Sequence, residues 1–339
     1  MSEMQPRIKG LGYEVPANIR TNTDPIFDWL NNWLKSNPKV GNPFTGYTTR
    51  HVLADGEDLM TIMVPAALKA LADARVDASQ IDMLLGYASV SPYPNPNELT
   101  RLHQMIGLPK SAWVVPLNNE FSNFNAGLVF ADALIKAGRA KNILIVVGGN
   151  WTRHVDYHTV QSVSAADGAG AAVVGLSADP AKWQVLDQQT LTVSENYGTM
   201  YMQGAKYPQN PPVDGHSALW SDTFFQITAA GFQDFGSFGG QAAPKAVLDL
   251  MAHNALTGAD ISLIAHQASQ SLIDVWQKTI LPAQLISTIS NFANMTVANI
   301  PVTLAWSVAN QPVTQSNLVL FALAPDMHAN ALLLRRNPA

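Results

Sequence analysis

The chain has 339 residues, of which 47% are hydrophobic and only 13% are charged, about half the usual charged share of roughly 25%. Its formal net charge is −5 and no run of Lys or Arg exceeds two residues, which argues against nucleic acid as the main partner. It contains no cysteine, which excludes a disulfide framework, a cysteine-ligated zinc site and a cysteine nucleophile.

The low charge content predicts either a sizeable subunit interface or an extensive buried core. Residues 1–10 lack the charged start and apolar run of a secretory signal, and no stretch of about 18 apolar residues predicts a membrane-spanning helix. We therefore expect a cytoplasmic protein with no membrane partner. His154 and His158 are four residues apart, but no carboxylate pattern of a metal site accompanies them, so no metal is expected.

Short apolar runs alternate with helical patterns along the first half. The run at residues 141–148 is rich in β-branched residues and ends at two glycines, which is typical of a central strand covered on both faces. Residues 124–137 have the apolar spacing of a helix that ends near Gly138. Strands are predicted at residues 82–88, 113–117, 141–148 and 168–175.

The second half repeats this order of elements. Pro301 falls in the first turns of the last predicted helix, where proline is tolerated. Strands are predicted at residues 183–193, 261–265, 317–323 and 331–334, and helices at residues 243–253, 269–278 and 297–308. The repeated order of elements predicts a duplicated α/β architecture.

Residues 194–241 do not follow this order. They are rich in glycine, proline and aromatic residues, and predict either an irregular lid over a pocket or a surface loop packed by its own aromatic side chains. The aromatic residues that suggest this are Tyr197, Tyr201, Tyr207, Trp220, Phe224 and Phe225.

Five segments, in order along the chain, resemble motifs of the β-ketoacyl-acyl-carrier-protein synthase III family of the thiolase superfamily. They are IKGLGYEVP at residues 8–16, TGYTTRHV at 45–52, ADGAGAAV at 166–173, HQAS at 266–269 and NMTVANIP at 294–301. The resemblance implies an α/β fold, the thiolase-like five-layered αβαβα sandwich built from two similar halves.

The resemblance also sets expectations about organisation and substrate. The two halves would be residues 1–178 and 179–339, and the protein would form a homodimer. The substrate would be an acyl thioester of coenzyme A or of the phosphopantetheine on an acyl carrier protein. No separate cofactor is implied.

Members of this family load an acyl group onto a cysteine at the N-terminus of a buried helix, where the helix dipole and free N–H groups lower the thiol pKa. The corresponding turn here reads LNNEFSNF at residues 117–124. Matching Phe124 and Gly138 to the family's Phe and helix-ending Gly puts Phe121 at the nucleophile position. A phenyl ring cannot attack a thioester. The resemblance therefore predicts that the covalent step is lost and that the ring projects into the acyl tunnel.

His266 and Asn294 match the pair that holds the thioester carbonyl in this family and promotes decarboxylation or deprotonation of the second substrate. Imidazole and amide groups supply the hydrogen-bond donors that an enolate or oxyanion needs. Read without the resemblance, His266 is a residue at a strand end with a structural role, and Asn294 caps a helix. Both alternatives stay open at this point.

Glu120 and Ser122 flank Phe121. A carboxylate in a buried turn is costly unless it is paired or protonated, so Glu120 suggests a catalytic acid or base, or a group that interacts favourably with the helix N-terminus. Ser122 is the nearest hydroxyl and a candidate substrate-binding residue. Its alternative role is a helix cap, and a helical step of about 100° turns it away from the nucleophile's direction.

Other positions depart from the family pattern. The aromatic residue that the partner subunit contributes to the acyl pocket falls near Asn95, a candidate substrate-binding residue. The basic residues that grip coenzyme A and dock the carrier protein fall at Thr159 and Ser271. Either Trp29 or Trp33 corresponds to a family tryptophan that stacks on adenine, with core or interface packing as the alternative for both. Residues 324–330, APDMHAN, lack the glycines that a close backbone approach needs.

Three functions follow. The first is an acyltransferase that handles an acyl thioester without a cysteine acyl-enzyme, by direct transfer or decarboxylative chemistry, in specialised or fatty-acid-type metabolism. The second is a non-catalytic subunit that pairs with a cysteine-bearing homologue as a heterodimer. The third is a binding protein whose acyl tunnel holds another small molecule. An open polar cavity around Phe121 favours the enzyme, and a plugged one favours the subunit.

Overall fold

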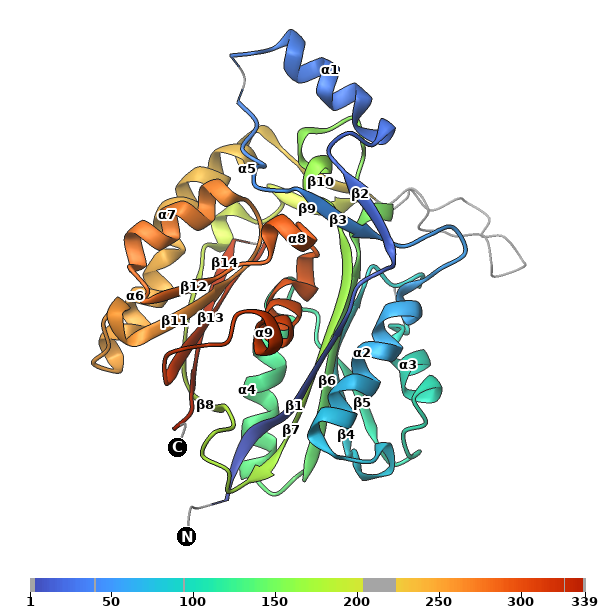
Figure 1. Cartoon of the computed structure of the whole chain (residues 1–339), viewed down its shortest axis with the longest axis vertical. Helices are drawn as coiled ribbons and strands as arrows, with labels where there is room; N and C mark the ends of the chain where they lie inside the picture. Colours follow the sequence, from blue (N-terminus) through green and yellow to red (C-terminus); the bar gives the residue numbers. More distant parts are fainter. Residues whose placement is uncertain (1–3, 40, 94, 204–223, 326, 338–339) are drawn as a thin grey trace.

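Two five-stranded sheets dominate the computed structural model, which describes residues 4–337 except 40, 94, 204–223 and 326 (Figure 1). The first sheet has the strand order β1-β7-β6-β4-β5, and the second has the order β12-β11-β13-β14-β8. The strands of the first sheet are β1 (Gln5–Glu14), β4 (Met83–Ser89), β5 (Trp113–Pro116), β6 (Asn142–Asn150) and β7 (Asp167–Ser177). Those of the second are β8 (Gln184–Thr192), β11 (Ile261–Ala265), β12 (Gln284–Ile286), β13 (Asn317–Leu323) and β14 (His328–Arg335).

The two sheets repeat one pattern of pairing. In the first, β5, β4 and β6 are parallel, and β7 and β1 continue the sheet antiparallel. In the second, β12, β11 and β13 are parallel, and β14 and β8 continue it antiparallel. All strands of the first sheet precede residue 178, and all strands of the second follow residue 183. The duplicated architecture predicted from the sequence is thus confirmed.

Helices form three layers around the sheets (Figure 1). One layer covers the outer face of the first sheet, one lies between the sheets, and one covers the outer face of the second. The layer outside the first sheet contains α2 (Leu59–Ala74) and α3 (Leu99–Met105). The layer between the sheets contains α4 (Asn123–Lys136) and α9 (Asn299–Asn310). The layer outside the second sheet contains α6 (Pro244–His253) and α7 (Gln270–Ile280). The result is the five-layered αβαβα sandwich.

Strand side chains alternate between two hydrophobic cores, which explains the continuous apolar runs in the sequence. In β6, Ile143 and Ile145 face the central helices while Leu144 faces α2 and α3. In β13, Leu320 faces the central helices while Phe321 faces α6 and α7. Because both faces of each sheet are covered, few polar positions remain in the strands.

Two glycines in β1 let a helix approach the sheet directly. An ideal Cβ on Gly10 would lie 2.2 Å from the backbone nitrogen of Ala74, and one on Gly12 would lie 2.3 Å from the carbonyl oxygen of Ala66. Both contacts are with the backbone of α2, which cannot yield as a flexible side chain does. A side chain at either position would push α2 off the sheet.

Residues 194–241 were predicted to be an irregular lid or a surface loop, but the part that the structure describes is largely regular. An antiparallel pair, β9 (Met200–Gln203) and β10 (Phe224–Ile227), is followed by α5 (Ala229–Asp234) and a π-helical segment, η6 (Phe235–Ala242). Tyr207 and Trp220 lie outside the described residues. Side chains of these elements line a cavity, so the described part of the segment does cover a pocket, as a lid would.

The remaining elements are short. β2 (Asn18–Thr21) and β3 (Thr49–Val52) pair antiparallel, and α1 (Asp28–Ser36) and α8 (Ile289–Phe292) are the other α-helices among the described residues. The single-turn helices are η1 (Pro25–Phe27), η2 (Ala78–Gln80), η3 (Trp151–Arg153), η4 (Val160–Ser164), η5 (Ser194–Asn196), η7 (Gly258–Asp260) and η8 (Thr296–Ala298). No helix in the described part of the chain is long and apolar enough to cross a membrane.

Two strand predictions need correction. Residues 324–330 are not all loop, because β14 begins at His328, which pairs with β8, and Ala329 and Asn330 pair with β13. β14 therefore starts three residues earlier than predicted. The segment 183–193 contains one strand, β8, which runs from Gln184 to Thr192, rather than several strands.

Candidate functional site

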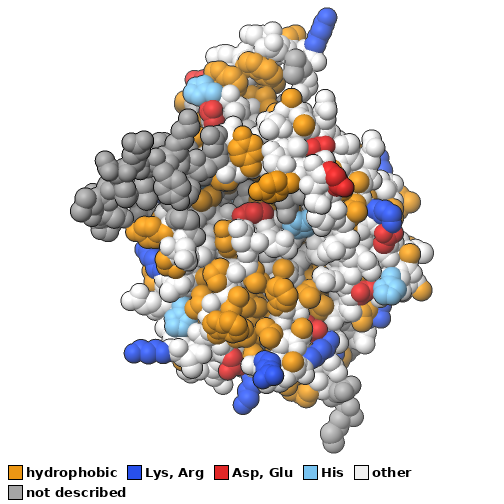
Figure 2. Space-filling model, turned by 180° about the vertical axis from the view of Figure 1, so that it is seen from behind, with side chains coloured by type: hydrophobic (Ala, Val, Ile, Leu, Met, Phe, Trp, Pro, Cys, Tyr) orange, Lys and Arg blue, Asp and Glu red, His pale blue; other side chains and the backbone are white. Residues whose placement is uncertain are grey.

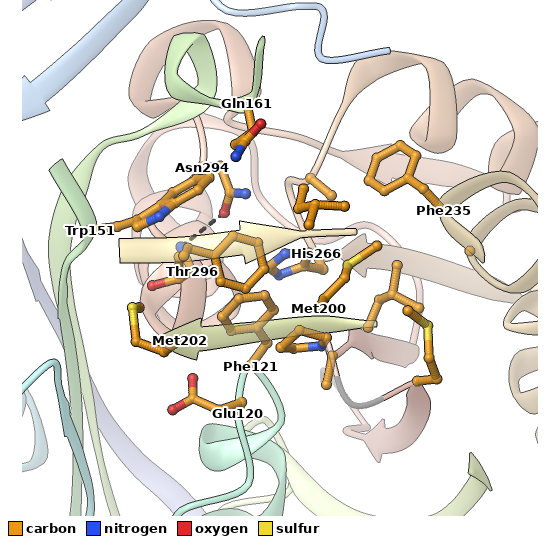
Figure 3. Close-up of a pocket in the computed structure, with 18 of the residues that line it drawn as sticks. Glu120, Phe121, Trp151, Gln161, Met200, Met202, Phe235, His266, Asn294 and Thr296 are labelled. Carbon is orange, nitrogen blue, oxygen red and sulfur yellow. Dashed lines mark hydrogen bonds between the residues drawn. The ribbon is translucent and has the colours of Figure 1, made fainter. Parts of the chain in front are cut away.

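A cavity of about 360 Å³ opens where the parallel strands of both sheets end (Figure 3). Ser89, Trp151, His266 and Ala324 line it, and each lies at or just after the carboxyl end of β4, β6, β11 or β13. Ligands in open α/β sheets bind at this edge. The β9–β10 pair and η6 contribute Met200, Met202, Phe225, Ile227, Phe235 and Phe238 to the lining.

The cavity is mostly apolar with a small set of polar groups. Its lining includes the side chains of Glu120, Gln161, Asp234, His266 and Asn294. Among the described residues that line it there is no Lys and no Arg. An apolar pocket with a few polar groups that fix orientation is typical of a small-molecule site.

Phe121 lies in the turn between β5 and α4 and projects into the cavity (Figure 3). Its φ of +63° is in the left-handed region, which a residue with a bulky side chain seldom adopts. Its ring stacks on the imidazole of His266, with centroids 4.8 Å apart and planes 12° apart. The ring covers the histidine and leaves the cavity open.

Strained backbone is concentrated around this cavity. Thr296 (φ +52°) and Met327 (φ +58°) also line it, and Ala293 (φ +53°) immediately precedes Asn294. Such conformations cost of order 1–3 kcal/mol each and persist only where the surrounding packing imposes them. Their clustering with Phe121 supports a functional role for the cavity.

His266 is held as a neutral imidazole. Its side chain is only 2% exposed, and burial lowers its pKa to about 3. At neutral pH the ring therefore has one nitrogen that carries a proton and one that accepts a hydrogen bond.

Asn299 decides which nitrogen of His266 carries the proton. The backbone N–H of Met295 donates to Asn299 Oδ1 (2.7 Å), which identifies the other end of this amide as the donor. Asn299 Nδ2 then lies 3.2 Å from His266 Nδ1 and donates to it. Nδ1 is therefore the acceptor, and Nε2 carries the proton.

The same residue orients Asn294. Asn294 Oδ1 accepts from Asn299 Nδ2 (2.7 Å) and from the backbone N–H of Thr296 (2.9 Å). With its oxygen satisfied twice, Asn294 presents its NH₂ group to the cavity, which it lines (Figure 3). His266 and Asn294 thus form a pair of hydrogen-bond donors, as an oxyanion or carbonyl site requires.

Glu120 lines the cavity directly before Phe121, with its side chain partly buried. Burial raises the pKa of Tyr87 to about 12, and the negative charge of Glu120 contributes to this rise. Tyr87 is therefore protonated at neutral pH and is a hydrogen-bond donor rather than a base.

Three other predicted residues lie away from the cavity lining. Ser122 is buried and its Oγ is 2.7 Å from His328 Nε2, so the predicted capping hydrogen bond is replaced by a contact with β14. Trp29 is 37% exposed on α1 and stacks on Trp33. Asn95 is exposed in the segment after β4. Substrate-binding roles for these three remain predictions.

Sequence reasoning missed two polar residues of the site. Asn299 belongs to the motif NMTVANIP, in which it follows Asn294 by five residues. This pair of asparagines was the sequence signal that could have identified Asn299 as a site residue. Gln161 lines the cavity from η4 and is 4% exposed, and its side-chain amide has no hydrogen-bond partner among the described residues. No sequence pattern pointed to Gln161. Within the described chain no three His, Asp or Glu side chains gather as metal ligands.

Comparisons with known proteins agree with this geometry. A profile of the family described as 3-oxoacyl-[acyl-carrier-protein (ACP)] synthase III matches residues 116–192. The β-ketoacyl-[acyl-carrier-protein] synthase III of Rhodospirillum rubrum is 27% identical over 322 residues, which cover 92% of this chain and 93% of the relative. The chain is thus similar in sequence to synthase III proteins, and its fold is that of thiolase-like structures.

Solved structures support the fold of this synthase-III-like chain. The 3-oxoacyl-[acyl-carrier-protein] synthase III from Aquifex aeolicus superimposes with a TM-score of 0.80 at 19% identity, covering 97% of this chain and 99% of that one. A variant of OleA from Xanthomonas campestris gives a TM-score of 0.82 at 15% identity, covering 99% and 98%. The family resemblance and the fold class predicted from the sequence are confirmed.

The low pKa of His266 makes a prediction about stability. The unfolded chain binds a proton at the ordinary pKa of 6.5, whereas folded His266 binds it near pH 3. This residue should therefore lower the free energy of unfolding as the pH falls from 6.5 towards 3, by at most about 1.4 kcal/mol per pH unit. His266→Gln should make the fall shallower when urea unfolding is measured at pH 7, 6 and 5. His158→Gln, at an exposed ring, should keep the wild-type slope. Equal slopes in all three proteins would contradict the assignment.

Proposed function

We propose that the protein is an acyltransferase that handles acyl thioesters of coenzyme A or acyl carrier protein without a cysteine acyl-enzyme. The observation that carries this is the donor pair formed by His266 Nε2 and Asn294 Nδ2, both fixed by Asn299 and both at the wall of an open cavity. Two oriented donors suit a thioester carbonyl whose oxygen gains negative charge when it is attacked. The similarity to synthase III proteins supplies the substrate class.

Loss of the covalent step is compatible with catalysis. If thioester and acceptor bind together, positioning can supply roughly 7–11 kcal/mol of the barrier reduction. The donors are held by a buried network and need no reorganisation when charge develops. Direct transfer and decarboxylative chemistry both use the same pair.

We further propose that Phe121 occupies the position of the family's nucleophile. Its side chain points into the cavity from the start of the central helix and touches the ring of His266. Its left-handed φ is the strained geometry expected of a residue that a sharp turn presents to a pocket. The partner-subunit and binding-protein functions remain the alternatives. The cavity is open but mostly apolar, so the support for the enzyme over the partner subunit comes from the polar pair His266 and Asn294 in its wall.

A homodimer is part of this proposal. β5 is an edge strand that pairs only with β4 among the described residues, and it carries Trp113 with its side chain 65% exposed. A short apolar edge strand of this kind is a template for pairing with another chain. Figure 2 shows a broad hydrophobic area with few charged side chains on one face of the molecule, as expected for a protein whose charge content is 13%.

His266→Ala should lower the turnover of octanoyl-coenzyme A in the presence of acceptors by about 10²-fold or more, the usual effect of removing an oxyanion donor. Release of coenzyme A, followed with a thiol reagent, measures it. His253→Ala, on the outer helix α6, is the matched control and should keep wild-type turnover. Unchanged turnover in His266→Ala would rule out the proposed role.

Phe121→Cys should restore a site for covalent loading. Incubated with octanoyl-coenzyme A, this variant should gain the mass of one octanoyl group, and hydroxylamine should remove it. Ser122→Cys is the control, because its side chain is buried against His328 and should stay unmodified. Intact-protein mass spectrometry reads both, and equal labelling of the two variants would contradict the position assigned to Phe121.

The dimer proposal predicts a particle of twice the chain mass in sedimentation equilibrium. Trp113→Glu should shift it towards the monomer, because a charge on the edge strand opposes pairing. Val308→Glu, an equally exposed apolar position on α9, should leave the mass unchanged. A monomeric wild-type protein would refute the homodimer.

A further inference from the structure

Asn299 joins the two hydrogen-bond donors of the site. It is the first residue of α9 and is completely buried. His266 follows β11 directly, and Asn294 lies in the segment between α8 and η8, so the two donors come from different parts of the fold. Among the described residues, Asn299 is the one side chain that forms a hydrogen bond with the ring of His266. The orientation of a single amide therefore governs both donors.

The hydrogen bonds of this network all run in one direction. They start at the backbone N–H of Met295, which donates to Asn299 Oδ1 (2.7 Å). Because a backbone N–H can only donate, the opposite end of this amide is its NH₂ group. That group donates to His266 Nδ1 (3.2 Å) and to Asn294 Oδ1 (2.7 Å), which uses both of its protons. The far ends of the two acceptor side chains, His266 Nε2–H and the Asn294 NH₂ group, are then donors.

Two further contacts oppose a reversal of this direction. The backbone N–H of Thr296 donates to Asn294 Oδ1 (2.9 Å), so turning that oxygen to the cavity would leave a buried N–H unpaired, which is costly (Figure 3). The ring of Phe121 stacks on His266 with the two planes 12° apart, which opposes rotation of the imidazole. The direction is thus fixed by the backbone of the chain and by packing, before any ligand is bound.

We propose, building on the function proposed above, that Asn299 is a positioning residue that sets the polarity of the site. Through it, both groups that face the cavity are hydrogen-bond donors, and the ligand group that they hold is an acceptor such as a thioester carbonyl oxygen. His266 then activates the carbonyl and does not take up a proton, since Nε2 carries one already and Nδ1 is occupied by Asn299.

The chemistry of the amide explains why position 299 decides the polarity. An aspartate has the same shape but carries an acceptor where Asn299 has its NH₂ group, and the N–H of Met295 favours its ionised form. Asn299→Asp would therefore draw the proton of His266 to Nδ1 and leave Nε2 as an acceptor. The new carboxylate would also lie against Asn294 Oδ1, which is itself an acceptor. Asn299→Leu would remove the control of both donors without reversing it.

Nitrogen NMR of the full-length protein labelled with nitrogen-15 histidine tests the polarity without any substrate. The chain has eight histidines, and the signals of His266 are identified by their loss in His266→Gln. At pH 7 the wild-type protein should show an unprotonated Nδ1 and a protonated Nε2, in at least tenfold excess over the other tautomer. Asn299→Asp should exchange the two states, and Asn299→Leu should give a mixture.

Asn310→Asp is the matched control for the NMR measurement. Asn310 is the exposed last residue of the same helix, so this variant should keep the wild-type tautomer. A protonated Nδ1 in the wild-type protein would overturn the proposal. So would a tautomer that neither substitution at position 299 alters.

Kinetics with octanoyl-coenzyme A test the consequence for turnover. Asn299→Leu should lower kcat about tenfold or more and change KM less than threefold, because the substrate still fits while the donors lose their fixed direction. Asn310→Leu should keep both constants. Should Asn299→Leu not fold, Asn299→Asp, which preserves the shape of the side chain, gives the same measurement.

The kinetic outcomes separate this proposal from the function on which it rests. Wild-type kcat in both variants at position 299, together with a large loss in His266→Ala, would refute the role of Asn299 and leave the acyltransferase function standing. A wild-type protein that turns over no thioester would refute that function, and the nitrogen NMR would still decide the polarity of the site.

Discussion

The side chain of Asn299 is the interaction on which the site depends. One buried amide accepts from the backbone of Met295 and donates both to His266 and to Asn294. It thereby sets the tautomer of the imidazole and the orientation of the second amide. Each of the three residues is at most 5% exposed, so water competes little for these hydrogen bonds.

The central helical layer holds this network in place. Asn299 is the first residue of α9, and Phe121 precedes the first residue of α4 by two positions. Both helices lie between the sheets and share one hydrophobic core with strands of each. Because each helix packs against both sheets, the turns before the helices are held in place. The residues Phe121 and Thr296 in these turns can therefore keep a left-handed backbone conformation that an exposed loop would not keep.

The cavity combines rigid polar chemistry on one wall with adaptable apolar surface on another. His266 and Asn294 stand at strand and helix ends of the duplicated core, whereas Met200, Met202 and Phe225 come from the inserted β9–β10 pair. Methionine side chains fill irregular space easily. The wall with His266 and Asn294 supplies fixed hydrogen-bond donors for a carbonyl oxygen. The wall formed by the β9–β10 pair supplies an apolar surface that can adapt to the shape of an organic group.

The sequence alone determined the architecture and the absence of any cysteine. Buried strands such as β6 and β13 are covered on both faces, so their apolar runs stand out, and the motifs around His266 and Asn294 lie in local segments that are readable one by one. What only the tertiary structure decided depends on contacts distant in sequence. Asn299 meets His266 across 33 residues, and Ser122 meets His328 across 206, in place of the expected cap. The stacking of Phe121 on His266 arises from packing two sheets around one helical layer, and no local pattern encodes which side chains that packing brings together.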